Sequence, residues 1–194
     1  MTSGPFYFDA CCFIDMAAHG MGIATKAERE PHVFFCRKTL EASRASEAEV
    51  FTSTLTLMEC SFVRDNSKPP GQEIILNDKV KSLFNAMIMS TKAGVMPVQP
   101  TPKILRAARE LRWTHGITLS TMDALHVATA MEMKCSHFIT TDRNFKVENL
   151  KKIEAMGLAV CSAESVSHLL PHKYGQLPFP LPQKPAQAAP TNPA

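Results

Sequence analysis

Short apolar runs of strand length alternate with longer helix-like segments along this chain of 194 residues. Apolar content predicts strands at residues 5–9, 50–53, 94–98, 138–141 and 158–161, and helical periodicity predicts helices at 25–48, 54–63, 72–90, 101–115 and 121–134. Strands that alternate with helices favour a parallel sheet, because each parallel crossover has room for a helix. The predicted fold class is therefore α/β, a three-layer α/β/α arrangement around a central, mostly parallel sheet.

Length and composition indicate one folded domain followed by a tail. The chain is long enough for one sizeable core, and two small domains are not expected. We predict a domain over residues 1–175 and a Pro/Ala-rich tail over 176–194. Such a tail cannot bury enough apolar surface to offset the entropy lost on ordering, so we expect it to be disordered or polyproline-like.

Membrane insertion and secretion are not expected. No apolar run approaches the roughly 20 residues of a spanning helix, and the N-terminus lacks the basic and apolar segments of a secretory signal. The six cysteines contain no C-x-x-C pair, and the adjacent Cys11 and Cys12 would point in opposite directions on a strand. We therefore expect reduced, mostly buried thiols in a cytoplasmic protein, and no structural zinc.

Four acidic residues lie at the ends of the predicted elements. Asp9 and Asp142 each end a strand-like run, whereas Glu59 and Asp123 lie where helices are expected to begin. In an open α/β sheet, ligands gather outside the carboxyl ends of the strands. Carboxylates that met there would suit Mg²⁺ or Mn²⁺, because these hard cations prefer oxygen ligands.

Each acid also has a purely structural explanation. Glu59 and Asp123 follow Thr56 and Ser120 by three residues, which is the spacing of a capping box, and Asp142 could cap a helix that starts at the next residue. These explanations leave unexplained why an acid twice follows an apolar strand. Four acids that met would also repel one another unless a cation neutralised them. Taken jointly, the acids therefore favour a metal site.

Four short motifs, taken in order, resemble those of PIN domains. They are FYFD at 6–9, Ser53 with Thr56 and Glu59, DALHVATA at 123–130, and ITTDRNF at 139–145. The resemblance covers roughly residues 5–162, and within the family the chain is most similar to the VapC-like toxins of toxin–antitoxin pairs.

The resemblance implies a specific activity and specific partners. It implies an Mg²⁺- or Mn²⁺-dependent endoribonuclease that hydrolyses RNA phosphodiester bonds, with four metal-site acids, Asp9, Glu59, Asp123 and Asp142. It also implies a small antitoxin protein as inhibitor and the possibility of a homodimer.

The chain departs from the family pattern beside two of these acids. PIN domains usually place Thr or Ser, then Asn or Ser, after the first Asp, whereas Ala10 and Cys11 stand here. The change removes a hydroxyl that would orient the acid. Asn144 stands where a further acid is often found, so a second metal ion would be held less firmly.

Two further titratable residues near the acids are kept out of the predicted site. Asp15 is interpreted as a solvent-facing helix residue. His126 lies one turn after Asp123 in a mostly apolar helix, and it is interpreted as a packed, hydrogen-bonded residue.

RNA binding would need positive charge around the acids. Arg143, next to Asp142, is the best candidate for a phosphate contact, and Ser53 is a second candidate for a substrate contact. A further row of cations follows helical spacing beside Trp113, namely Arg106, Arg109 and Arg112, although a solvated helix face is the commoner meaning of such a row.

Two other functions remain open at this stage. Because of Ala10 and Cys11, the chain could be a catalytically weak PIN-like module that binds RNA or protein. A small-molecule phosphatase is a weaker alternative, since its nucleophilic aspartate requires D-x-D after the first strand and Cys11 takes the place of the second acid.

Overall fold

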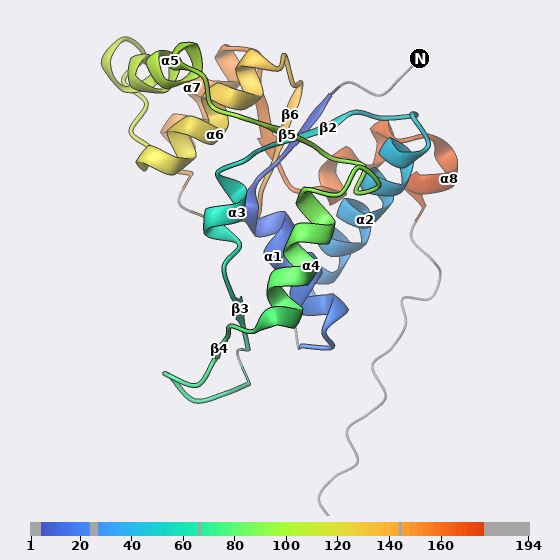
Figure 1. Ribbon diagram of the computed structural model, residues 1–194. Helices are drawn as coiled ribbons and strands as arrows, with labels where there is room; N and C mark the ends of the chain where they lie inside the picture. Colours follow the sequence, from blue (N-terminus) through green and yellow to red (C-terminus); the bar gives the residue numbers. More distant parts are fainter. Residues whose placement is uncertain (1–4, 24–26, 66, 144, 177–194) are drawn as a thin grey trace, which may run out of the picture.

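The computed structural model describes residues 5–23, 27–65, 67–143 and 145–176, and the predictions made for Asn144 and for the tail beyond residue 176 lie outside them. A parallel sheet with the order β5-β2-β1-β6-β7 forms the centre of the molecule (Figure 1). Its strands are β1 (Phe6–Phe8), β2 (Val50–Ser53), β5 (Met96–Val98), β6 (His137–Ile139) and β7 (Ala159–Cys161). The strands predicted from the apolar runs all belong to this sheet.

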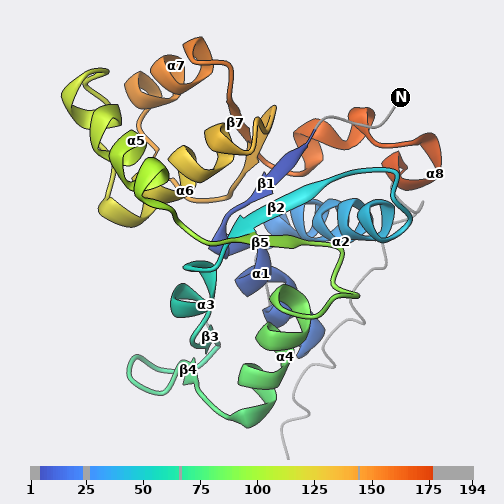
Figure 2. The same ribbon diagram turned by 45° about the horizontal axis from the view of Figure 1, so that its top comes forward.

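Helices cover both faces of the sheet, which confirms the three-layer α/β/α class (Figure 2). One face is covered by α1 (Ala10–Gly20), α2 (Glu30–Arg44) and α4 (Asp78–Ile88). The other face is covered by α5 (Pro102–Trp113), α6 (Thr121–Glu132) and α7 (Val147–Ala155). Two short elements, η2 (Glu164–Leu169) and α8 (His172–Gly175), pack against α2, and η1 (Ala27–Arg29) leads into it. None of the described helices is long and apolar enough to cross a membrane.

The apolar run of β1 is buried on both sides because successive side chains of a strand point to opposite faces. Phe6 and Phe8 pack into the core under α1, α2 and α4, whereas Tyr7 packs into the core under α5, α6 and α7. All three are fully buried. Asp9 follows directly, so the first predicted acid lies at the carboxyl edge of the central strand.

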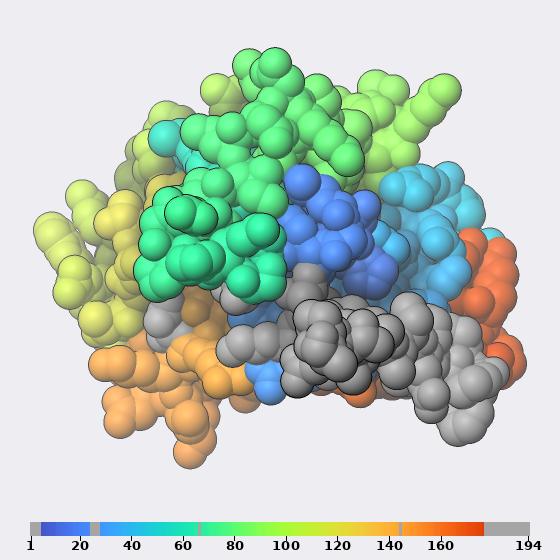
Figure 3. Space-filling model, turned by 90° about the horizontal axis from the view of Figure 1, so that it is seen from below, coloured from blue at the N-terminus to red at the C-terminus, as the bar shows by residue number. Residues whose placement is uncertain are grey.

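The segment between β2 and α4 differs from the prediction. The predicted helix 54–63 is reduced to the four-residue α3 (Thr56–Glu59), followed by a hairpin of β3 (Val63–Arg64) and β4 (Ile74–Ile75). Val63 is fully buried and pairs with Ile75, so strand pairing and burial override the local helical preference. Figure 3 shows the hairpin and α4 (green) beside one end of α1 (blue), with α2 (light blue) on its other side.

Two local details also correct the sequence interpretation. Cys11 and Cys12 lie in the first turn of α1 and not on a strand. The helix begins at Ala10, whose amide donates a hydrogen bond to the capping Asp9 carboxylate. No helix begins directly after Asp142, since α7 begins at Val147. Pro97 lies in β5, an outer strand of the sheet, where a proline is tolerated.

Candidate functional site

Three of the four predicted acids follow neighbouring strands of the sheet. Asp9 comes directly after β1, Glu59 lies in α3 beyond the end of β2, and Asp142 lies just beyond β6. The strand order places β1 between β2 and β6. Because parallel strands end at the same edge, these segments meet at one edge of the molecule.

Asp9 is held by hydrogen bonds from two segments of the chain, the start of α1 and the loop after β6. One oxygen, Oδ1, accepts from the Ala10 amide at 2.8 Å, and the other, Oδ2, accepts from the Thr140 hydroxyl at 2.8 Å. The residue is only 7% exposed. Burial raises the pKa of the Asp9 carboxyl, while nearby His126 and the hydrogen bonds from Thr140, Cys11 and Ala10 act in the opposite direction.

This raised pKa predicts a pH-dependent penalty on folding. Asp9 ionises less readily in the folded chain than in the unfolded one, so its contribution to stability is best at low pH and is lost as pH rises through its folded pKa. In EDTA near neutral pH, Asp9→Asn should therefore be more stable than wild type. A relief of about 1 kcal/mol would raise the melting temperature by roughly 2–4 °C.

The measurement is thermal unfolding of both proteins in EDTA across the acidic and neutral range. The difference in stability should shrink as pH falls through the folded pKa of Asp9 toward the unfolded value of about 3.9. A difference that stays constant over this range would show that ionisation of Asp9 does not penalise folding.

Asp9, Glu59 and His126 form the closest group of potential ligands at this edge. One ligand atom of each lies within 4.8 Å of the others. Glu59 Oε2 is 2.6 Å from His126 Nε2, and the histidine is fully buried. The interpretation of His126 as a packed, hydrogen-bonded residue is confirmed, and its hydrogen-bond partner is the predicted site residue Glu59. The only sequence signal was its place one helical turn after Asp123.

The donor chemistry of this group fits a hard divalent cation. Two carboxylates converge from separate elements, and one of them, Asp9, is buried with its pKa raised by burial. A bound cation would favour the ionised form of such a carboxylate. Asp9 and Glu59 would then supply oxygen ligands of the kind that Mg²⁺ and Mn²⁺ prefer.

Asp123 and Asp142 are not part of the cluster within 4.8 Å among the described residues. Asp123 is in the first turn of α6, where its amide donates to the Ser120 hydroxyl at 3.1 Å, as one half of the predicted capping box. The Asp142 amide donates to Thr140 Oγ1 at 3.0 Å, the hydroxyl that also donates to Asp9. Their part in a metal site stays a prediction.

The capping box predicted for Glu59 is wrong. α3 begins after Leu55, which makes no side-chain cap, and the Thr56 hydroxyl is buried at 2.8 Å from that of Thr52. The Ser53 hydroxyl accepts from the Leu55 amide at 3.2 Å, and Ser53 is fully buried. A substrate contact by Ser53 therefore stays a prediction that its buried position does not favour.

Asp15 is not the solvent-facing residue expected from the sequence. It is 6% exposed, pairs with Arg29 at 2.8 Å and accepts from the Thr141 hydroxyl at 3.2 Å. These contacts tie α1 to the loop that carries Asp142. Its position one helix turn beyond Cys11 faces that loop rather than water.

Cys11 takes over part of the role of the missing hydroxyl. Its Sγ lies 3.3 Å from Thr140 Oγ1 and accepts from the Thr141 amide at 3.2 Å. The thiol thus contacts the loop that contains Asp142 and whose Thr140 donates to Asp9. A thiol is a weaker hydrogen-bond partner than a hydroxyl, so this support is present but weaker.

A second group of potential ligands, formed by Cys12, His32 and Cys36, is buried in the core. His32 Nδ1 accepts from the Ala163 amide at 3.1 Å, so the ring proton is on Nε2, which lies 3.3 Å from Cys36 Sγ. Burial raises the pKa of both thiols and lowers that of His32 to about 4. These contacts make the group a hydrogen-bonded cluster within the core.

Exposed cations flank the acidic edge. Arg143 has 82% of its side chain exposed and pairs with Glu28 at 3.0 Å. It lines a pocket of about 300 Å³ together with Cys11, Arg29, Thr141 and Asp142. The row Arg106, Arg109 and Arg112 is exposed on α5, and Arg109 lies 4.9 Å from the centre of the Trp113 ring.

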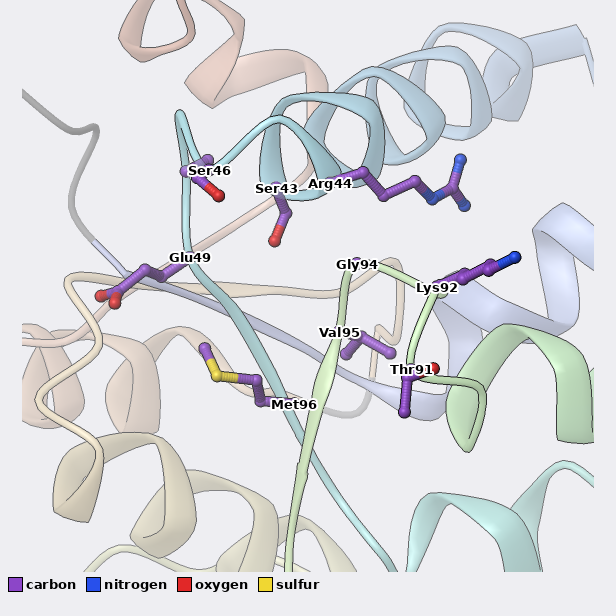
Figure 4. Close-up of a pocket in the computed structure, with 10 residues that line it drawn as sticks. Ser43, Arg44, Ser46, Glu49, Thr91, Lys92, Gly94, Val95 and Met96 are labelled. Carbon is purple, nitrogen blue, oxygen red and sulfur yellow. The ribbon is translucent and has the colours of Figure 1, made fainter.

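A larger cavity of about 690 Å³ lies at the opposite end of the sheet (Figure 4). It is lined by residues before β2 and β5 and by the end of α2, including Arg44, Glu49 and Lys92. Glu49 is the one acid among the residues that line it. This cavity therefore lacks the converging carboxylates found at the carboxyl edge.

One known protein family matches most of the chain. The PIN domain family matches residues 7–148. No curated protein matches the chain. Among solved structures, one match is a chain of the crystal structure of FitAcB from Neisseria gonorrhoeae, with 18% identity, a TM-score of 0.45, and coverage of 81% of this chain and 97% of that chain. Such a distant match carries no information on function. The family match spans most of the sequence and includes all four acids, and the chain belongs to the PIN domain family.

Proposed function

We propose that this protein is a metal-dependent endoribonuclease that uses Mg²⁺ or Mn²⁺ to hydrolyse RNA phosphodiester bonds. The observation that carries the proposal is the convergence of Asp9 and Glu59 at the carboxyl edge of the central strand, within 4.8 Å of each other. Membership in the PIN domain family, whose members are typically metal-dependent nucleases, supports the same reaction class.

In this proposal all four acids contribute to binding the cation. Asp9 and Glu59 would bind it from β1 and α3, and Asp123 and Asp142 would complete the site from α6 and the loop after β6. A bound divalent cation would supply Lewis acidity toward the phosphodiester and stabilise the charge that develops there. Thr140 keeps one oxygen of Asp9 in a fixed direction through its 2.8 Å hydrogen bond.

RNA would approach across exposed cations beside these acids. Arg143 is exposed and next to Asp142, so it is our candidate for a phosphate contact. The exposed arginines of α5 belong to a helix that packs against α6. The first turn of α6 contains Asp123. Single-stranded or loop RNA is the expected substrate, because unstacked bases are accessible there.

The partners and the compartment belong to the same proposal. We propose that the protein is the toxin of a toxin–antitoxin pair, inhibited by a small antitoxin protein and able to form a homodimer. All six cysteines are free thiols in the structure, which suits a reducing compartment and supports a cytoplasmic location.

The test is cleavage of a mixed panel of structured and unstructured RNAs with Mn²⁺, Mg²⁺ or EDTA. We expect cleavage with either metal and none with EDTA, and restoration when Mn²⁺ is added in excess. Metal-independent cleavage would contradict the proposal. If no RNA is cut although the protein is folded and binds Mn²⁺, the alternative of a catalytically weak module that binds RNA or protein is favoured, since Cys11 replaces a hydroxyl beside Asp9.

A further inference from the structure

Two successive hydrogen bonds between side chains connect β1 to Glu59. His126 Nε2 lies 2.6 Å from Glu59 Oε2, and His126 Nδ1 lies 2.7 Å from the Tyr7 hydroxyl. Both Tyr7 and His126 are fully buried, whereas the Glu59 side chain is 28% exposed. These two hydrogen bonds thus connect the interior under α6 to Glu59 at the carboxyl edge of the sheet.

The contacts of Tyr7 decide which nitrogen of His126 carries the proton. The Tyr7 hydroxyl is fully buried, and a phenol has one hydrogen to donate. Its single hydrogen then needs an acceptor, and among the described residues the one recorded at its oxygen is His126 Nδ1. With Nδ1 accepting, the proton of a neutral ring is on Nε2 and is donated to Glu59.

The same geometry disfavours His126 as a metal ligand. Its Nε2 lone pair is replaced by the N–H that faces Glu59. Two ligands of one octahedral Mg²⁺ or Mn²⁺ ion lie about 2.9 Å or more apart, since each is about 2.1 Å from the ion. The observed 2.6 Å separation is that of a direct, charge-assisted hydrogen bond.

Glu59 needs such support because its own element provides little. α3 has four residues and no side-chain cap, and it leads into the β3–β4 hairpin. His126 belongs to the twelve-residue α6, which packs against α5 and β2. A rigid donor that fixes Oε2 would leave the other oxygen of Glu59 aimed at a cation.

We propose that His126, set in its Nε2–H form by Tyr7, is a positioning residue that orients the Glu59 carboxylate toward the metal site and does not itself bind the metal. This inference rests on the proposed metal-dependent function. It assigns to an interior histidine, and to the central residue of β1, a part in building the site.

The test measures Mn²⁺ binding to wild type and to four variants. Electron paramagnetic resonance reports the concentration of the free ion. His126→Leu removes the donor and should weaken Mn²⁺ binding by about 10–100-fold, while His126→Gln, which keeps an N–H donor, should restore part of the loss. Glu59→Gln should weaken binding at least as much. Adding His126→Leu to Glu59→Gln should cause no further loss, because His126 acts through Glu59.

A second readout reports the proton directly. Long-range ¹H–¹⁵N spectra of the wild-type chain should show His126 as the Nε2–H form, both in EDTA and with Mg²⁺. Melting curves in EDTA should first establish that each variant is folded. Loss of the Nε2 proton when Mg²⁺ is added would make His126 a ligand and overturn the inference.

The outcomes separate the inference from the function on which it rests. Wild type that binds Mn²⁺, together with His126→Leu that binds it equally well, would overturn the positioning role and leave the proposed function intact. Additive losses in the double variant would also overturn it, since His126 would then act independently of Glu59. Wild type that binds no Mn²⁺ would overturn both.

Discussion

Asp9→Asn is expected to lower metal-dependent RNA cleavage by about 10³-fold or more while the fold persists. Removing a charged ligand from the proposed site withdraws several kcal/mol of stabilisation of the transition state, and about 1.4 kcal/mol corresponds to tenfold in rate. Asparagine keeps the Oδ1 acceptor that caps α1 through the Ala10 amide. The loss should therefore come from the missing charge and not from unfolding.

The measurement compares single-turnover cleavage rates of wild type, Asp9→Asn and Asp78→Asn with Mn²⁺. Asp78 is an exposed acid in the first turn of α4, so its replacement controls for the loss of one negative charge. We expect Asp78→Asn to retain wild-type activity. The Mn²⁺-induced rise in melting temperature should vanish for Asp9→Asn alone. Full activity of Asp9→Asn would remove the central residue from the proposed site.

Asp123→Asn and Asp142→Asn are each expected to reduce cleavage by about 10²–10³-fold. Among the described residues, neither acid is part of the group of Asp9 and Glu59, so their variants test whether the site extends beyond the observed group. The fold should tolerate both changes. The contacts that order the two segments, from the Asp123 amide to Ser120 and from the Asp142 amide to Thr140, come from the backbone and remain.

The same RNA substrate and the same Asp78→Asn control serve this second comparison. Mn²⁺ titrations should show weaker binding by both variants, so that activity partly recovers at high Mn²⁺ concentration. Unchanged activity of one variant would limit the site to the remaining acids. Unchanged activity of both would reduce the proposed site to Asp9 and Glu59.

Local sequence pattern was sufficient to predict those elements whose burial is evident from their own residues. The run Phe6–Phe8 is apolar at every position, as expected for a strand buried on both faces, and it forms the central strand. The spacing of Ser120 and Asp123 predicted the start of α6 correctly. The same spacing at Thr56 and Glu59 failed, because Thr56 turns its hydroxyl to Thr52 in the interior.

Long-range contacts could not be predicted from local sequence pattern. The hydrogen bond from His126 to Glu59 joins residues 67 positions apart, and that from Thr140 to Asp9 joins residues 131 apart. The burial of Asp15 likewise depends on Thr141, which is 126 positions away. Periodicity reports which face of an element is apolar, but it does not report which distant side chain lies against that face.

The sequence by itself determined the α/β alternation, the carboxyl-edge positions of the acids and their resemblance to the PIN domain family, because these depend on residue type and on spacing along the chain. Only the tertiary structure decided which acids meet, that Asp9 and Glu59 lie close to His126, and that Tyr7 contacts that histidine. The physical reason is that hydrogen bonds between distant segments form only after the sheet has brought β1, α3 and α6 together.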